Sequence, residues 1–110
     1  MTDILDRSHL AEFSGGDEAL EQDVLAMFRG HGADYLVELA EANDPATFRA
    51  VAHKLKGAAR AVGARKLAAI AEDAEKTGAR SSSIDPCVAF VAPLKAAFVE
   101  LCGVIDALKA

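Results

Sequence analysis

Apolar residues recur at steps of three and four along most of the chain, which is the spacing of an amphipathic helix. Four stretches show it, residues 17–43, 45–62, 64–78 and 86–109, and a short helix over residues 2–12 precedes them. No stretch has the alternation of β-branched residues that marks a strand. The pattern predicts an all-α fold. We expect an antiparallel up-down-up-down four-helix bundle with a short extra N-terminal helix, formed by residues 1–110 as a single domain.

Capping signals place the ends of these helices. Asp44 and Pro45 read as an N-cap and a first helical residue, and residues 83–86 repeat that pattern with an Asp-Pro pair. Gly63 and Gly78 fit the C-terminal ends of two helices.

Three residues interrupt the helical pattern. Gly30 and Gly32 allow a kink or a break in the stretch 17–43. Pro93 either sits in a kink of the last helix or moves its start later.

Composition narrows the class of protein. The chain of 110 residues is 52% hydrophobic and 26% charged, as in a folded domain. It has no signal peptide and no apolar run near the roughly 20 residues of a membrane span, so we expect a cytoplasmic protein that binds no membrane. Its net charge of −5 disfavours nucleic acid. Cys87 and Cys102, placed on one helix about 22 Å apart, predict neither a disulfide nor a metal site.

The charge is unevenly distributed along the chain. No acidic residue lies between Asp44 and Glu72, and the residues between them carry a local charge of +6, against −11 for the rest of the chain. The six basic residues are Arg49, Lys54, Lys56, Arg60, Arg65 and Lys66. Such a segment can steer an acidic partner or hold an anionic group.

His53 lies inside this basic segment and points away from the predicted core. The apolar stripe of its helix consists of Phe48, Val51, Leu55, Ala58 and Val62. At 100° per residue, His53 is displaced by about 200° from both Val51 and Leu55. The same helical geometry predicts that Lys56, Gly57, Arg49 and Arg60 share the exposed face with His53.

This face has the chemistry of a group acceptor. An exposed neutral imidazole can act as a nucleophile. Lys56, one turn along, can offset the negative charge of a phosphoryl group. Gly57 costs about 1 kcal/mol relative to Ala in a helix, which makes sense if a partner must approach the backbone beside His53.

The segment His-x-Leu-Lys-Gly-Ala-Ala from His53, followed by Val62-Gly63-Ala64 and Leu67, resembles the histidine-containing phosphotransfer (HPt) domain family. The resemblance covers essentially the whole chain. It implies a four-helix bundle that relays phosphoryl groups between receiver-domain aspartates, or between a receiver and a sensor histidine kinase, with no catalytic activity of its own. His53 would be the phosphoacceptor through Nε2, Lys56 would stabilise the phosphoryl group, and Gly57 would leave room for a receiver loop. No cofactor is implied, because the receiver supplies the magnesium ion.

The resemblance also implies roles for residues outside the motif. Many members place a Gln 22 residues after the His, bonded to the other ring nitrogen, and this chain has Glu75 there. Glu75 would accept a hydrogen bond from Nδ1 and orient the imidazole, or it would be an ordinary surface residue pairing with Lys76 or Arg80. Receiver docking is expected at an apolar patch ringed by basic residues, namely Ile4, Leu5, Ala50 and Ala61 with Arg49 and Arg60.

Three alternatives remain. The chain could be an HPt module of a chemotaxis-type kinase, although an initial Met and a helical end favour a complete small protein. We expect that protein to be a monomer. It could be a helical adaptor that binds a receiver without accepting phosphate. A small helical enzyme is disfavoured because no nucleophile–base couple faces a predicted pocket. His9 and His31 lack the Lys-Gly that follows His53 and are expected to be plain surface residues, and the three histidines lack the spacing of a metal site.

Overall fold

The structure, a computed structural model, describes residues 4–108, with the side chain of Phe13 excepted. Within that range every regular element is a helix and no strand occurs, so the predicted all-helical fold is confirmed. The helices are α1 (Arg7–Ser14), α2 (Glu18–Glu41), α3 (Pro45–Val62), α4 (Arg65–Arg80), α5 (Asp85–Val88) and α6 (Val91–Ala107).

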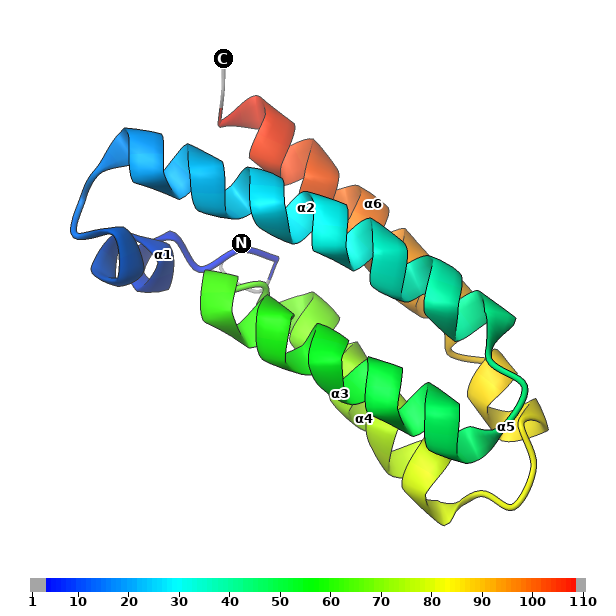
Figure 1. Ribbon diagram of the computed structural model, residues 1–110. Helices are drawn as coiled ribbons and strands as arrows, with labels where there is room; N and C mark the ends of the chain where they lie inside the picture. The colour runs from blue at the N-terminus through cyan, green and yellow to red at the C-terminus, as the bar shows by residue number, and fades with distance from the viewer. Residues whose placement is uncertain (1–3, 109–110) are drawn as a thin grey trace.

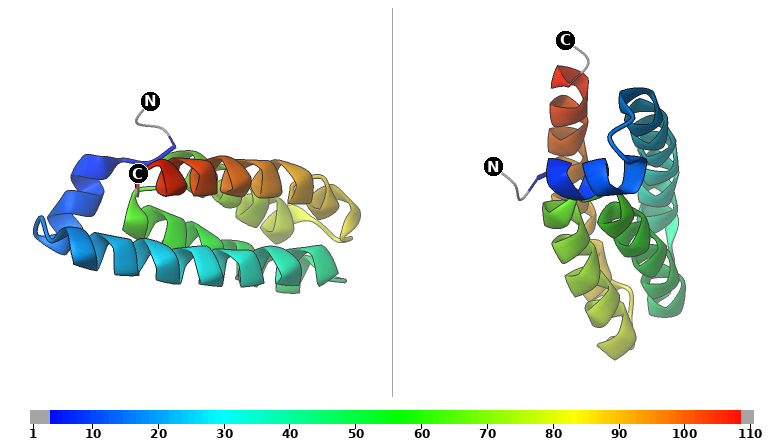
Figure 2. Two further views of the ribbon diagram at one scale, coloured as in Figure 1. Left: turned by 90° about the horizontal axis from the view of Figure 1, so that it is seen from above. Right: turned by 90° about the vertical axis from the view of Figure 1, so that its left-hand side faces the viewer.

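The four long helices form an elongated bundle of 45 × 22 × 21 Å. In Figure 1, α2 lies along α6 and α3 lies along α4, and α2 also packs on α3 while α4 packs on α6. The short α1 crosses one end of the bundle (Figure 2). The large side chains that are fully buried between these helices are Phe48, Leu10, Leu25, Leu39, Leu55, Leu67, Leu94, Leu101 and Ile105.

Helix α3 begins and ends at the residues that the sequence indicates. The Asp44 carboxylate accepts hydrogen bonds from the Thr47 amide at 2.8 Å and from the Thr47 hydroxyl at 2.9 Å, and Pro45 occupies the first turn. At the other end Gly63 has φ +80°, the left-handed conformation that favours glycine. The backbone N–H of Asp6 donates to the Gly63 carbonyl at 2.7 Å, which attaches the N-terminal segment to this turn.

Three glycines predicted to interrupt or end helices lie inside them. Helix α2 is continuous through Gly30 and Gly32, and a Cβ on Gly32 would lie 2.5 Å from Cε1 of Phe98. The absence of a side chain at Gly32 leaves room for the Phe98 ring, and the helix is not broken there. Gly78 does not end α4, because the helix continues to Arg80.

The last predicted helix is divided into two helices. α5 ends at Val88, and α6 starts at Val91 with Pro93 in its first turn, where an amide N–H would have no partner within the helix. Of the two predicted outcomes for Pro93, a kink or a later start of the last helix, the structure shows the later start. Asp85 is the first residue of α5 and makes no capping hydrogen bond. Cys87 lies in α5 and Cys102 in α6, so their placement on one helix was wrong, and both are free thiols.

The first helix also begins later than predicted, at Arg7, and the proposed start at residue 2 lies outside the described residues. Its N-cap is Asp6, whose side chain accepts from the His9 amide. The capping aspartate is a local signal that the apolar spacing alone does not show.

From the sequence we expect no stretch apolar enough to span a membrane, but the segment Asp85–Ala107 is long and apolar enough to do so. An 18-residue window of it has a mean hydropathy of 1.9, which would suffice together with its length. This is weak evidence for a membrane span, because a core helix of a soluble protein has the same properties. Five α6 residues are indeed buried in the bundle: Leu94, Ala97, Phe98, Leu101 and Ile105.

Candidate functional site

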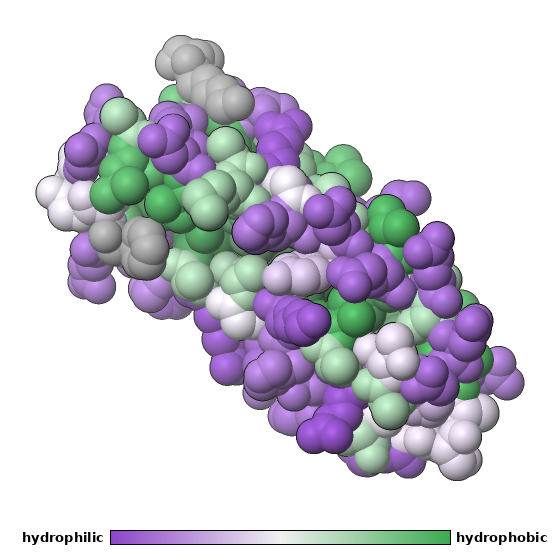
Figure 3. Space-filling model, in the orientation of Figure 1, coloured by the Kyte–Doolittle hydropathy of each residue, from purple (hydrophilic) through white to green (hydrophobic). Residues whose placement is uncertain are grey.

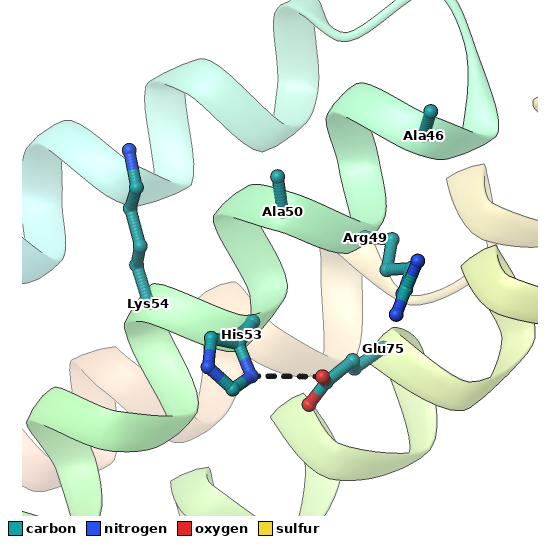
Figure 4. Close-up of a pocket in the computed structure, with 6 residues that line it drawn as sticks. All are labelled: Ala46, Arg49, Ala50, His53, Lys54 and Glu75. Atoms are coloured by element: carbon teal, nitrogen blue, oxygen red, sulfur yellow. Dashed lines mark hydrogen bonds and ion pairs between the residues drawn. The ribbon is translucent and has the colours of Figure 1, made fainter.

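The imidazole of His53 projects from the outer face of α3. Its side chain is 65% exposed, whereas the neighbouring residues Ala52 and Leu55 are fully buried. The predicted orientation away from the core is therefore found. Figure 4 shows the ring lying toward α4, with one ring nitrogen on Glu75 and the other directed away from it.

Glu75 binds two groups of α3 at once. Its Oε2 lies 2.8 Å from Nδ1 of His53, and its Oε1 lies 2.6 Å from Nζ of Lys56. The carboxylate comes from α4, which packs along α3 after the turn at Gly63, so residues 53 and 75 meet at the same height of the bundle. The alternative partners Lys76 and Arg80 form no ion pair with Glu75 among the described residues.

Lys56 departs from the predicted exposed face. Only 16% of its side chain is exposed, and its ammonium is held by Glu75. Helical periodicity sets the direction of the Cα–Cβ bond, but the long stem of a lysine can follow a neighbouring helix toward a carboxylate. Lys56, one helical turn after His53, is thus a partner of Glu75 in this structure.

The contacts of Glu75 determine how the His53 ring is protonated. The Lys56 ammonium lowers the pKa of the Glu75 carboxyl below its ordinary value, burial opposes this effect, and the hydrogen bond with His53 adds to it. Glu75 is therefore ionised at neutral pH and can only accept hydrogen bonds. At 2.8 Å the proton of that bond must belong to Nδ1. In the neutral ring, Nε2 then keeps its lone pair and faces solvent.

Open backbone and a shallow hollow lie beside the imidazole. A Cβ on Gly57 would meet no other atom within 4 Å, so the fold itself does not require glycine there. A shallow hollow adjoins His53 on the N-terminal side of α3 (Figure 4). The residues that line it are Ala46, Arg49, Ala50, His53, Lys54 and Glu75.

The basic segment is largely neutralised by its own fold. Besides Lys56 with Glu75, the ion pairs are Arg60 with Glu72 at 3.5 Å, Arg65 with Asp6 at 2.7 Å and Lys66 with Glu100 at 2.7 Å. Arg49 and Lys54 make no ion pair with the residues that the structure describes, and they flank His53. Hydrophilic side chains dominate the face seen in Figure 3, and hydrophobic ones form scattered patches there.

The residues predicted for docking lie in different environments. Ala50 and Ala61 are exposed on α3, and Ile4 is half-buried against the core. Leu5 is only 4% exposed and belongs to the core, so its assignment to a surface was wrong. The hydrogen bond from Asp6 to Gly63 holds this segment against the bundle and turns Leu5 inward.

The other histidines lack these contacts. His9 and His31 are exposed, and neither side chain pairs with a carboxylate of residues 4–108 as His53 does. Among residues 4–108 no group of three or more His, Cys, Asp or Glu side chains is arranged to hold a metal ion.

A comparison with protein-family models matches residues 23–110 to the Hpt domain. The chain belongs to the Hpt domain family. The match runs from α2 to the end of the chain and leaves α1 outside it. Comparisons with curated proteins and with solved structures each gave no match.

Membership implies that this Hpt domain is a histidine phosphotransfer module of two-component systems. Sequence reasoning did not assign Ala46 and Lys54 to the site, although both line the hollow beside His53. Ala46 lies two turns before His53, and this i−7 spacing on one helix face could have identified it.

Proposed function

We propose that this Hpt domain carries a phosphoryl group on Nε2 of His53 and exchanges it with the aspartate of a receiver domain or with a histidine kinase. The supporting observation is the pairing of an exposed imidazole with Glu75, which holds the proton on Nδ1 and leaves Nε2 as the nucleophile. His9 and His31 have no such contact within the described part of the chain.

The step needs no proton to be removed from the ring. The Nε2 lone pair attacks phosphorus, the bond between phosphorus and the aspartate oxygen breaks, and its electron pair stays on the carboxylate of the donor. The product is a phosphoimidazolium whose positive charge lies beside the Glu75 carboxylate, 2.8 Å from Nδ1. Return of the phosphoryl group to a second aspartate reverses each change, so Glu75 orients the ring in both directions.

Two features would accommodate the phosphoryl group and its donor. The Lys56 ammonium has three N–H donors, so it can keep its bond to Glu75 and give another to a phosphoryl oxygen. Gly57 leaves the backbone one turn after His53 uncovered for a receiver loop.

The partners follow from the same proposal. A receiver supplies the aspartate and its own magnesium ion, and this chain contributes no cofactor. The receiver would dock over Ala50 and Ala61 on α3, with Ile4 at the edge and Arg49 and Arg60 at the rim. The module would act as a cytoplasmic monomer, without nucleic acid or membrane.

The test is transfer from phosphorylated receiver domains of the same organism, with the label mapped by mass spectrometry. We expect His53→Gln to abolish labelling, while the matched variants His9→Gln and His31→Gln keep the wild-type rate. A label that persists in His53→Gln would show that the acceptor lies elsewhere. A wild-type protein that binds a receiver but never becomes labelled would instead be an adaptor.

A further inference from the structure

Gly78 is a buried glycine inside a helix of an alanine-rich chain. Glycine within a helix is about 1 kcal/mol less favourable than alanine. It does not end the helix, since α4 continues to Arg80, and its backbone has no positive φ. Its place in α4 therefore needs a different physical reason.

The reason is a close approach of α4 to the start of α3. A Cβ on Gly78 would lie 2.9 Å from Cβ of Arg49, 3.1 Å from the carbonyl oxygen of Pro45 and 3.2 Å from Cα of Arg49. These atoms belong to the backbone or are attached directly to it, so no side-chain rotation can move them away. The two helices can lie this close only if residue 78 has no side chain.

This contact is one helical turn from the functional site on both helices. Gly78 follows Glu75 by three residues on α4, and Arg49 precedes His53 by four residues on α3. The bonds from Glu75 to His53 and Lys56 are 2.8 and 2.6 Å long. A hydrogen bond weakens steeply once its heavy atoms separate beyond about 3.5 Å, so moving α4 outward by about one ångström would weaken both bonds.

We propose that Gly78 is a positioning residue for phosphoryl transfer, because it sets the spacing between α3 and α4 at which Glu75 reaches both His53 and Lys56. The inference rests on the proposed role of His53. Gly78 touches neither the imidazole nor the phosphoryl group and acts only through the position of Glu75.

The test compares Gly78→Ala with Gly103→Ala. Gly103 is also inside a helix, but a Cβ there would meet nothing within 4 Å, so this variant controls for helix propensity. We expect Gly78→Ala to slow transfer from a phosphorylated receiver on the order of 10-fold, and Gly103→Ala to keep the wild-type rate. The ¹⁵N NMR signals of His53 in the unphosphorylated protein should show less proton on Nδ1 in Gly78→Ala alone.

A double variant separates positioning from general loss of structure. If Gly78 acts through Glu75, then Gly78→Ala should slow transfer much less when Glu75→Ala, which removes the contacts with both His53 and Lys56, is already present. A full 10-fold loss in that background, or a wild-type rate and Nδ1 signal in Gly78→Ala, would overturn the proposal.

Two further results would also decide the proposal: failure of Gly78→Ala to fold, and absence of label on His53 in the wild-type protein. If Gly78→Ala does not fold, Glu75→Asp withdraws the carboxylate by one methylene without touching the helix contact. Transfer by that variant at the wild-type rate would overturn the requirement for close spacing, and a loss of about 10-fold would support it. If wild-type protein is never labelled on His53 yet Gly78→Ala alters the Nδ1 signal, the proposed function is wrong and Gly78 still positions Glu75.

Discussion

Replacing Glu75 by Gln tests how much the charge of this carboxylate contributes to the folded state. The amide has nearly the same shape, but its single oxygen can accept from only one of the two groups, Nδ1 of His53 or Nζ of Lys56, while its NH2 faces the other donor. The variant therefore removes the negative charge with little change in packing. The ammonium of Lys56, with 16% of its side chain exposed, loses its charged partner.

The magnitude follows from two charge-assisted contacts, of which one is lost and the other becomes weaker. Such a bond contributes about 1.5–3 kcal/mol when it involves a charged group and about 0.5–1.5 kcal/mol when both groups are neutral. The bond to Lys56 is mostly buried, but His53 is 65% exposed and solvent screens its share. We expect Glu75→Gln to lower the free energy of unfolding by about 1–2 kcal/mol at neutral pH.

The pH dependence gives the sharper test. The folded state lowers the pKa of Glu75, so its stabilising contribution is complete above the ordinary carboxyl value of about 4.3 and is lost as pH falls through the folded-state pKa. Urea unfolding followed by circular dichroism at neutral pH and near pH 3 should show a smaller difference between wild type and variant at the lower pH. The neutral-pH loss corresponds to about 1 M in the urea midpoint.

Glu72→Gln is the matched control on the same helix. Glu72 pairs with Arg60 at 3.5 Å and with Lys76 at 3.8 Å, both on the surface, and such pairs contribute about 0–1 kcal/mol. A stability deficit in Glu75→Gln that stayed the same at neutral pH and near pH 3 would refute the reasoning. So would a deficit no larger than that of Glu72→Gln.

Three other substitutions test the surrounding fold. Gly63→Ala should destabilise the protein by about 2 kcal/mol in urea unfolding, because φ is +80° and a Cβ would lie 2.8 Å from the Asp6 carbonyl oxygen; an unchanged midpoint would contradict this. Leu5→Ala should lower the free energy of unfolding by about 2–4 kcal/mol, but at temperatures where the variant is folded its affinity for a receiver should be unchanged. If folded Leu5→Ala lost more affinity than the half-buried control Ile4→Ala, the docking role of Leu5 would be restored. Asp44→Ala should speed amide hydrogen exchange in the first turn of α3 at neutral pH, because the variant removes the carboxylate that Thr47 hydrogen-bonds and whose pKa these bonds lower. The carboxylate's stabilising contribution is lost as pH falls through that lowered pKa, so an exchange effect that did not depend on pH would contradict this prediction.

The features that the sequence could predict are those determined by residues close together in the chain, such as helix caps and helical periodicity. Asp44 and Pro45 start α3, and Gly63 ends it, because each acts through its own backbone or its immediate neighbours. The outward direction of His53 follows from helical periodicity within the same segment. The contact of His53 with Glu75 was predicted from the family resemblance together with the helix turn at Gly63.

The parts that sequence could not predict depend on contacts between distant residues. A glycine inside a helix and a glycine at its end look alike in sequence, and only the approach of Arg49 distinguishes Gly78. The stem of Lys56 leaves its predicted face because Glu75 of the next helix attracts its ammonium. Leu5 lies in the predicted helix 2–12 but precedes α1 in the structure, and it is buried because Asp6 attaches to the turn after α3.

The pairing of the basic segment with the fold's own carboxylates has a kinetic consequence. Six unpaired positive charges in this segment would attract an acidic receiver over a long range, but four of them already pair with a carboxylate of the same domain. At physiological ionic strength the Debye length is about 8 Å, so Arg49 and Lys54 act on a receiver only at close range. Encounter rates should therefore depend weakly on salt, and one small domain could exchange phosphoryl groups with successive partners without holding either of them for long.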